Sequence, residues 1–191
     1  MSQQDRKKWN KRYAEDSYRK GNPVTLLENW IAHIPVGKAV DIACGAGRNA
    51  LFMAQSGFEV DAIDISSEGL KKAHQNAVSR GLHINWIEHD LDQPYNFEND
   101  YQLVVIMWYV NLTLISRLCN CLAPGGYLLC EEHLVSDCNV AGPGSSSFRV
   151  EPGQLREAVS GLNIVFYQES IEANDEGEQI ASARVVARRS A

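Results

Sequence analysis

The sequence lacks the features that would place it in a membrane, outside the cell or on nucleic acid. No apolar run is long enough to span a bilayer. The opening residues, MSQQDRKK, are polar with no apolar segment behind them, unlike a secretory signal peptide. An excess of positive charge is also missing, because the formal net charge is −6, which disfavours nucleic acid and anionic membranes as partners. We therefore expect a cytoplasmic protein with neither kind of partner.

Disulfide and metal-binding patterns are absent as well. The chain has five cysteines, an odd number, and most of them lie in apolar segments, which predicts reduced thiols. Cys119 and Cys121 are separated by a single residue and have no second cluster to complement them. This spacing is not that of a zinc site, so we expect no bound metal.

The remaining composition is that of one globular domain. The chain has 191 residues, of which 45% are hydrophobic and 22% charged, and it contains no internal repeat or low-complexity segment. Strand-like and helix-like segments alternate from residue 38 to residue 133. This alternation predicts an α/β fold: a doubly wound, Rossmann-like sheet of seven strands, mostly parallel with one antiparallel strand near the C-terminus, and helices on both faces.

A glycine turn lies between the first predicted strand, 38–43, and the helix predicted near 47–56. Gly45 and Gly47 place no β-carbons at this turn, so a ligand can approach the backbone and the free N–H groups of the helix. The second predicted strand ends at Asp64, whose carboxylate can accept hydrogen bonds from both hydroxyls of a ribose. Together these features predict a nucleoside-containing cofactor.

The acid before the glycines distinguishes between two kinds of cofactor. The spacing Gly-x-Gly-x-x-Ala over residues 45–50 also satisfies a relaxed dinucleotide fingerprint, which leaves a nicotinamide-dependent reductase as an alternative. Asp41, however, would repel a pyrophosphate and suit a cofactor that carries an ammonium and a sulfonium group. This position favours S-adenosylmethionine.

The pattern resembles that of the class I S-adenosylmethionine-dependent methyltransferases. The glycine turn, Asp64, Asp90-Leu91 and the segment 122–127 follow one another in the family's order. The resemblance implies an enzyme whose product is S-adenosylhomocysteine, with Asp90 accepting the adenine amine. It implies the following cofactor-binding residues: Trp9, Tyr13, Asp41, Gly45, Gly47, Arg48, Asn49, Asp64, Ile65, Asp90, Leu91 and Met107.

The ends of the chain are expected to cover this core. We divide the single domain into a helical lid and docking segment (1–35), a cofactor-binding core (38–133), and an acceptor-side loop with the final strands (134–191). A helix is predicted over residues 2–18, with Trp9 and Tyr13 on one face. These rings either dock the helix or, as in similar methyltransferases, fold over the cofactor. The Gly-, Ser- and Pro-rich segment 137–147 is predicted to be a lid loop.

The acceptor side offers three candidate catalytic residues, Tyr109, His133 and Arg149. His133 is predicted either to act as a base or anion-positioning group, or to be satisfied by the backbone. Arg149 is predicted either to attract an oxyanion or to form a surface ion pair. The chain has no Asn-Pro-Pro-Tyr-like segment of the kind found in amino methyltransferases of nucleic acids and proteins, so we expect a small-molecule acceptor.

Within the superfamily, residues 44–54 and 57–64 are most similar to the tellurite-resistance methyltransferases. This resemblance implies tellurite, selenite or a thiol as acceptor, although the polar residues of the acceptor side do not match that branch one for one. A non-catalytic module that uses the aromatic N-terminal helix as a contact surface is the remaining alternative. We expect a monomer or a weak homodimer.

Overall fold

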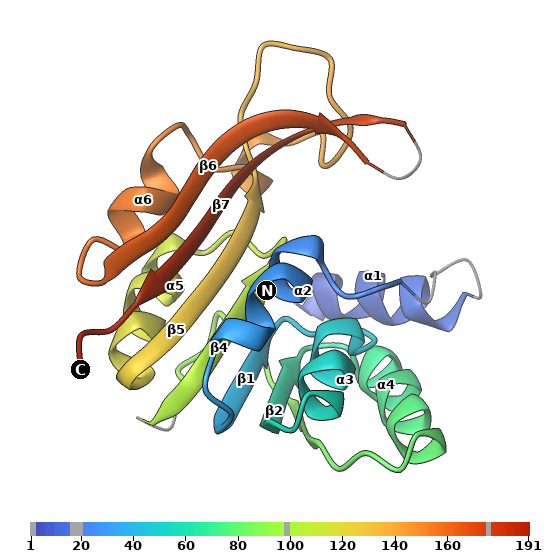
Figure 1. Cartoon of the computed structure of the whole chain (residues 1–191). Coiled ribbons are helices and arrows are strands. Elements are labelled where there is room, and N and C mark those ends of the chain that lie inside the picture. The colour runs from blue at the N-terminus through green and yellow to red at the C-terminus, as the bar shows by residue number, and fades with distance from the viewer. Residues whose placement is uncertain (1–2, 16–20, 98–99, 175–176) are drawn as a thin grey trace.

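A computed structural model describes residues 3–15, 21–97, 100–174 and 177–191. It contains a seven-stranded sheet with helices packed on both faces (Figure 1). The strands are β1 (Lys38–Ile42), β2 (Glu59–Asp64), β3 (Asn85–Glu88), β4 (Tyr101–Met107), β5 (Leu122–His133), β6 (Asn163–Ala173) and β7 (Gln179–Arg188). The helices are α1 (Gln3–Ala14), α2 (Thr25–Trp30), α3 (Arg48–Gln55), α4 (Ser67–Ser79), α5 (Leu112–Leu118) and α6 (Gln154–Ala158), with short 3-10 turns η1 (Ile31–His33), η2 (Cys119–Cys121) and η3 (Ser146–Phe148).

The strand order is β3-β2-β1-β4-β5-β7-β6. Neighbouring strands from β3 to β5 are parallel, and β7 runs antiparallel to both β5 and β6. The predicted Rossmann-like sheet with one antiparallel strand near the C-terminus is thus confirmed. The chain winds outward from β1 in one direction and from β4 in the other, and ligands of such sheets bind where the order reverses, beyond the carboxyl ends of the strands.

Two apolar clusters, one on each face of the sheet, hold the helices in place. The first includes Ile106 of β4 and Ile115 of α5, and α6 contributes Leu155 to it. The second joins Val105 of β4 to Met53 of α3 and to residues of α2 and α4. Because β1 and β4 are covered on both faces, their sequences are nearly continuous apolar runs, as expected for central parallel strands. In the described residues, no helix is both long and apolar enough to cross a membrane.

Two helix boundaries differ from the sequence prediction. α1 begins at Gln3 and ends at Ala14, and residues 2 and 16–18 of the predicted helix 2–18 lie outside the described part of the chain. The sequence also predicts a helix over residues 111–122, but α5 ends at Leu118, and β5 already begins at Leu122. Pro124, Gly125 and Gly126 predict a turn before this strand, but they lie instead in a bulge within β5, where the pairing shifts between Tyr101 and Leu103. A β-carbon on Gly126 would lie 2.7 Å from the carbonyl oxygen of Tyr101, so the strands meet closely there.

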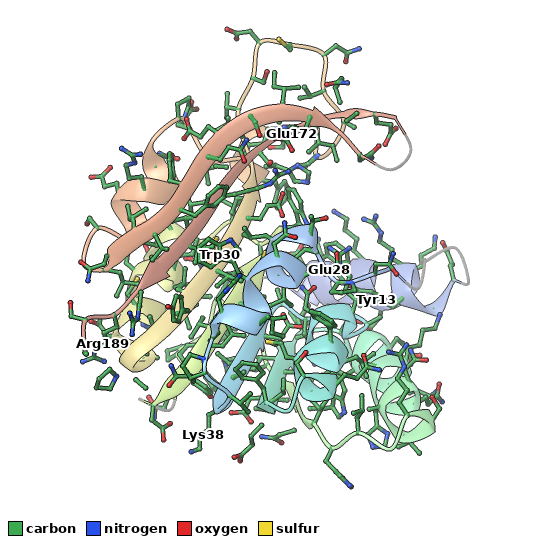
Figure 2. The ribbon with its side chains drawn as sticks, in the orientation of Figure 1. Tyr13, Glu28, Trp30, Lys38, Glu172 and Arg189 are labelled. Carbon is green, nitrogen blue, oxygen red and sulfur yellow. The ribbon has the colours of Figure 1, made fainter. Side chains whose placement is uncertain are left out.

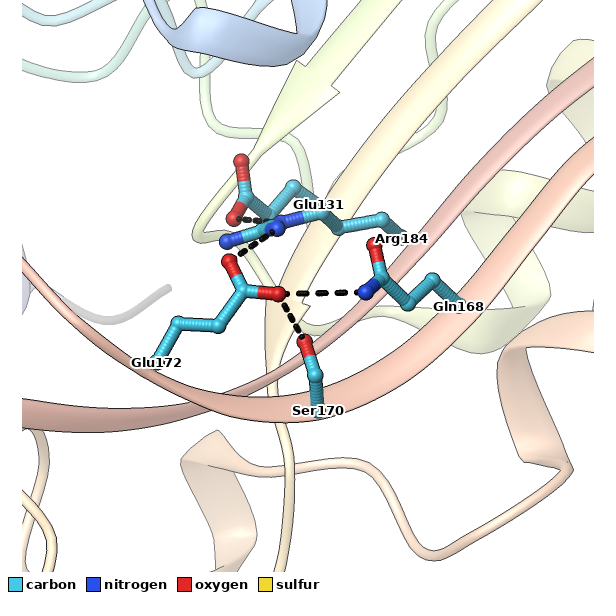
Figure 3. A network of polar contacts seen from close by, with 5 residues as sticks. All are labelled: Glu131, Gln168, Ser170, Glu172 and Arg184. Carbon is cyan, nitrogen blue, oxygen red and sulfur yellow. Dashed lines mark hydrogen bonds and ion pairs between the residues drawn. The ribbon is translucent and has the colours of Figure 1, made fainter.

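A charged network joins the last three strands. The Arg184 guanidinium on β7 donates to Glu131 on β5 (2.7 Å) and to Glu172 on β6 (2.8 Å), and Gln168 and Ser170 donate to Glu172 as well (Figure 3). Glu131 is only 5% exposed, and Arg184 is the cation that pairs with it among the described residues. The network fixes the carboxyl end of β5, which borders the predicted acceptor side.

Candidate functional site

The turn after β1 is built from residues in the left-handed region. Ala43 and Gly45 have a φ of 56°, and Gly47, which immediately precedes α3, has a φ of 78°. Left-handed backbone is costly for residues with a β-carbon, so the conformation of Ala43 is strained. This geometry reverses the chain within a few residues and directs the start of α3 toward the carboxyl ends of β1 and β2.

Asp64 links this turn to the end of β2. Its Oδ2 accepts the N–H of Gly45 and its Oδ1 accepts the N–H of Ser66, both at 2.8 Å. Burial raises the pKa of Asp64 above its usual value, against the lowering effect of these N–H groups. A carboxylate offers about four acceptor positions, so positions remain for ligand hydroxyls after these two bonds.

Asp41 and Asn49 lie beneath the turn. The Oδ2 of Asp41 accepts the N–H of Ala50 at 3.0 Å in the first turn of α3, and burial raises the pKa of Asp41 to about 7. The Oδ1 of Asn49 accepts the N–H of Val24 at 3.1 Å, which fixes the segment before α2. Both side chains therefore hold the elements that shape the turn, and direct contact with the cofactor stays a prediction.

α1 covers the glycine turn. Tyr13, labelled in Figure 2, is buried, and its hydroxyl would lie 2.1 Å from a β-carbon placed on Gly45. Its ring stacks on Trp9 at 5.9 Å, so the two aromatic residues share a face as predicted. Asn10 accepts a hydrogen bond from the Ser66 hydroxyl at 2.7 Å, and Arg6 forms an ion pair with Glu88 at 2.8 Å. The helix is thus docked over the predicted cofactor turn.

Replacing Gly45 by alanine should weaken binding of S-adenosylhomocysteine at least about tenfold. A left-handed φ costs a residue with a β-carbon roughly 1–2 kcal/mol, and tenfold corresponds to about 1.4 kcal/mol. The new methyl group would also displace Tyr13 and loosen α1. Calorimetric titration measures the affinity, and Gly144→Ala, at a glycine with open space around it, is the matched control. Equal affinities of the two variants would contradict this account of the turn.

The other predicted cofactor residues lie at the carboxyl ends of β2, β3 and β4. Asp90 forms a turn in which its Oδ1 accepts the N–H of Asp92 at 3.1 Å. Ile65, Leu91 and Met107 are buried apolar residues. Arg48 starts α3, and its charge lowers the pKa of Asp41.

The acceptor-side candidates lie after β4 and at the end of β5. Trp108 has a φ of 61°, uncommon for such a residue, and its ring centroid lies 4.4 Å from that of His133. The Tyr109 hydroxyl donates to Asp92 at 2.9 Å, and burial raises the pKa of Tyr109 to about 12. Burial, aided by Arg149, lowers the pKa of His133 to about 4. At neutral pH His133 is uncharged, so it can offer an anion only a neutral donor.

Arg149 stabilises the loop that follows β5 by hydrogen bonds to its backbone. Its guanidinium donates to the carbonyl oxygens of Leu134 (2.9 Å), Pro143 (3.0 Å) and Ala141 (3.2 Å). These bonds hold Gly142 against His133, because a β-carbon on Gly142 would lie 2.8 Å from the imidazole. From the sequence, Arg149 was expected to attract an oxyanion or to form a surface ion pair; its binding to three backbone carbonyl oxygens was not anticipated.

Glu132 is a site residue that the sequence analysis missed. Its side chain is fully buried; Oε1 accepts the N–H of Tyr109 at 3.2 Å, and Oε2 has no hydrogen-bond partner in the described part of the chain. Burial raises the pKa of Glu132 well above its usual value. The signal that could have identified it is an acid in the middle of an apolar strand, where burial of a carboxyl requires a specific partner.

An open cavity of about 710 Å³ lies elsewhere. Its walls include Lys38, Asp61, His74 and Trp86. Lys38, labelled in Figure 2, begins β1, so most of this cavity lies at the amino ends of the strands, although the Trp86 ring also packs against Gly47 in the turn. Open parallel sheets bind their ligands at the carboxyl ends, so we place the functional site there.

The residues at the turn fit S-adenosylmethionine better than a dinucleotide. Asp41 and Asp64 are both buried, and burial disfavours the charged form of each carboxyl. A cofactor with an ammonium and a sulfonium would stabilise these carboxylates, whereas a pyrophosphate would add negative charge beside them. The sheet, the turn and the two acids define a Rossmann-like domain for a positively charged nucleoside cofactor.

Comparison with known proteins agrees with this class. Residues 39–126 match the model of a family described as "Methyltransferase domain". A putative methyltransferase, YqeM of Bacillus subtilis, is 38% identical over 86 residues, which are 44% of this chain and 34% of that protein. The matched region spans about a third of the length of the curated relatives.

Two solved structures share the fold over nearly the whole chain. TehB from Haemophilus influenzae superposes with a TM-score of 0.74 at 20% identity, covering 96% of this chain and 66% of that one. The N-methyltransferase NodS from Bradyrhizobium japonicum, in complex with S-adenosylhomocysteine, gives a TM-score of 0.71 at 20% identity and covers 96% and 97%. At such identity the likeness shows the fold alone. The domain match adds that the segment 39–126 is similar to methyltransferase domains, which agrees with S-adenosylmethionine as the cofactor.

Proposed function

We propose that the chain transfers the methyl group of S-adenosylmethionine to a small-molecule acceptor bound beside the carboxyl ends of β4 and β5. The observation that carries the proposal is the hydrogen bond between the ends of two strands: Asp64, at the end of β2, accepts the N–H of Gly45 in the turn after β1. This bond places the N-terminus of α3 and a buried carboxylate on one side of the site. The helix N-terminus suits the carboxylate of the amino-acid tail of S-adenosylmethionine, and the buried acid suits its ribose and its cationic groups.

When bound, S-adenosylmethionine supplies a methyl group on a positively charged sulfur. The task of the protein is then to align the acceptor with that carbon, exclude water and, where needed, take a proton; alignment alone accounts for a large part of such a barrier. α1 and the loop held by Arg149 cover the site from two sides, which serves to exclude water. Neither Tyr109, with a pKa of about 12, nor His133, with a pKa of about 4, is poised as a base near pH 7.

Because neither Tyr109 nor His133 is poised to remove a proton near pH 7, we favour an acceptor that is already a nucleophile at neutral pH. Tellurite, selenite and small thiols are the candidates that the sequence resemblance suggests, and the shared fold with TehB is compatible with them. For thiols, neither Tyr109 nor His133 would take the proton near pH 7, so the acceptor would have to ionise in solution or lose its proton to another group.

The experiment is methyl transfer from labelled S-adenosylmethionine to a panel of tellurite, selenite, small thiols and small carboxylates, with S-adenosylhomocysteine binding measured in parallel. We expect S-adenosylhomocysteine to bind and at least one acceptor to be methylated. Absence of detectable S-adenosylhomocysteine binding would overturn the proposal, and protection by NADH alone would revive the reductase. Tight binding without transfer to any acceptor would favour a non-catalytic module.

A further inference from the structure

α1 is strongly basic although the whole chain is acidic. Between Gln3 and Ala14 it carries five basic residues and one acid, Asp5, in a chain with a net charge of −6. Arg6 is paired with Glu88, as described above. Lys8 and Arg12 form no ion pair with any carboxylate of the described residues. Within the described residues, these two cations of the helix that covers the cofactor turn therefore have no carboxylate partner.

These cations lie against aromatic rings. The Arg12 guanidinium is 5.2 Å from the centroid of the Trp9 ring, and the Lys8 ammonium is 5.9 Å from the same ring. The Lys8 ammonium is also 5.9 Å from the ring of Phe148, in η3, which is 54% exposed. We call Lys8, Trp9, Arg12 and Phe148 the α1–η3 cluster. It joins two segments that are 140 residues apart in the sequence.

The α1–η3 cluster lies beside the acceptor-side residues. Phe148 directly precedes Arg149, which holds the loop against His133. Arg6, in the first turns of α1, pairs with Glu88 at the end of β3, and the Tyr109 hydroxyl donates to Asp92, four residues further along the chain, so α1 also borders the segment that follows β4. A molecule that approaches the carboxyl ends of β4 and β5 would therefore meet both the rings and the cations.

We propose that the α1–η3 cluster binds the acceptor through an anionic group next to a flat apolar part, as in an aromatic carboxylate. This inference rests on the proposed function, because it names the substrate class of that site. Cations near low-dielectric ring faces attract an anion, and the exposed ring of Phe148 adds contact area for a planar group. A small inorganic oxyanion would use only the cations, and a neutral or cationic molecule only the rings.

The test compares 2-naphthoate with the uncharged 2-naphthamide by calorimetric titration into the protein saturated with S-adenosylhomocysteine. We expect the acid to bind at least about tenfold more tightly than the amide, and the preference to shrink with added salt. The double variant Lys8→Gln/Arg12→Gln should remove that preference without weakening the amide. Phe148→Ala should weaken both probes. The matched control is Lys71→Gln, which removes an exposed lysine from α4 and should change neither affinity.

The two proposals fail in different ways in this experiment. If S-adenosylhomocysteine binds but the acid shows no advantage over the amide, or the double variant keeps the preference, the inference is overturned and the proposed function stands. If S-adenosylhomocysteine does not bind, the proposed function fails, and the same titrations without it still decide whether the α1–η3 cluster selects an organic anion. Thermal unfolding of each variant checks that the fold is kept.

Discussion

The free energy of unfolding of the wild-type protein should fall by about 4 kcal/mol relative to that of Asp41→Asn as the pH rises from about 4 to about 7. Burial raises the pKa of Asp41 from 3.8 to about 7, and each pKa unit corresponds to about 1.4 kcal/mol. Between these values the unfolded chain has lost the proton while the folded protein still holds it, so a higher pH favours unfolding. The stabilising effect of the neutral carboxyl is complete below pH 4 and lost above pH 7.

Denaturant unfolding of both variants across this pH range measures the difference. Asparagine keeps an oxygen that can accept the N–H of Ala50, so the cap on α3 is retained. Asp137→Asn, at an exposed aspartate of the loop after β5, removes the same formal charge at the surface and is the control. A difference between wild type and Asp41→Asn that does not vary with pH would show that burial does not perturb this carboxyl.

Replacing Asp64 by alanine should weaken binding of S-adenosylhomocysteine by about 1–3 kcal/mol, roughly 5- to 150-fold in Kd. The substitution leaves the N–H groups of Gly45 and Ser66 without their acceptor and removes the oxygens expected to receive the ribose hydroxyls. Asp64→Asn should have a smaller effect, because one acceptor oxygen remains. Calorimetric titration of both variants measures these losses.

The comparison variant is Glu59→Ala, which removes an exposed acid from the other end of the same strand. It should leave the affinity for S-adenosylhomocysteine unchanged. If Asp64→Ala also bound like the wild type, the ribose would be held by other residues, and the role of Asp64 would be confined to joining the two turns.

The fold was predictable because its signals are local. Each apolar run identifies one strand, as for β1 and β4, and the glycines identify the turn between β1 and α3. The alternation of strands and helices then leaves few possible topologies. The start of β5 was not predictable, since Pro124 and two glycines read as a turn. Only the pairing with Tyr101 and Leu103, distant in sequence, shows that they form a bulge within a strand.

The site was predictable where one strand end or one turn forms it, and obscure where side chains from distant segments meet. Their positions in the sequence were enough to assign Asp64 and the two glycines to one site. In the structure, a hydrogen bond from the N–H of Gly45 to Asp64 joins them. Whether His133 is charged depends on its burial under the loop held by Arg149, and no local pattern reports that burial. Two other features also arise only in the folded chain: the Glu132 Oε2 atom without a hydrogen-bond partner among the described residues, and the cation–π contact between Lys8 and Phe148.

The position of β7 has a consequence for how the chain is made. β7 lies between β5 and β6, although it is synthesised after both. Until it emerges from the ribosome, β5 presents an unpaired apolar edge, which favours pairing with other chains. We expect β6 and β7 to form a hairpin first and dock onto β5 last, where Arg184 meets Glu131 across 53 residues of sequence. Premature termination before residue 179 would therefore yield an aggregation-prone chain, even though the cofactor turn would be complete.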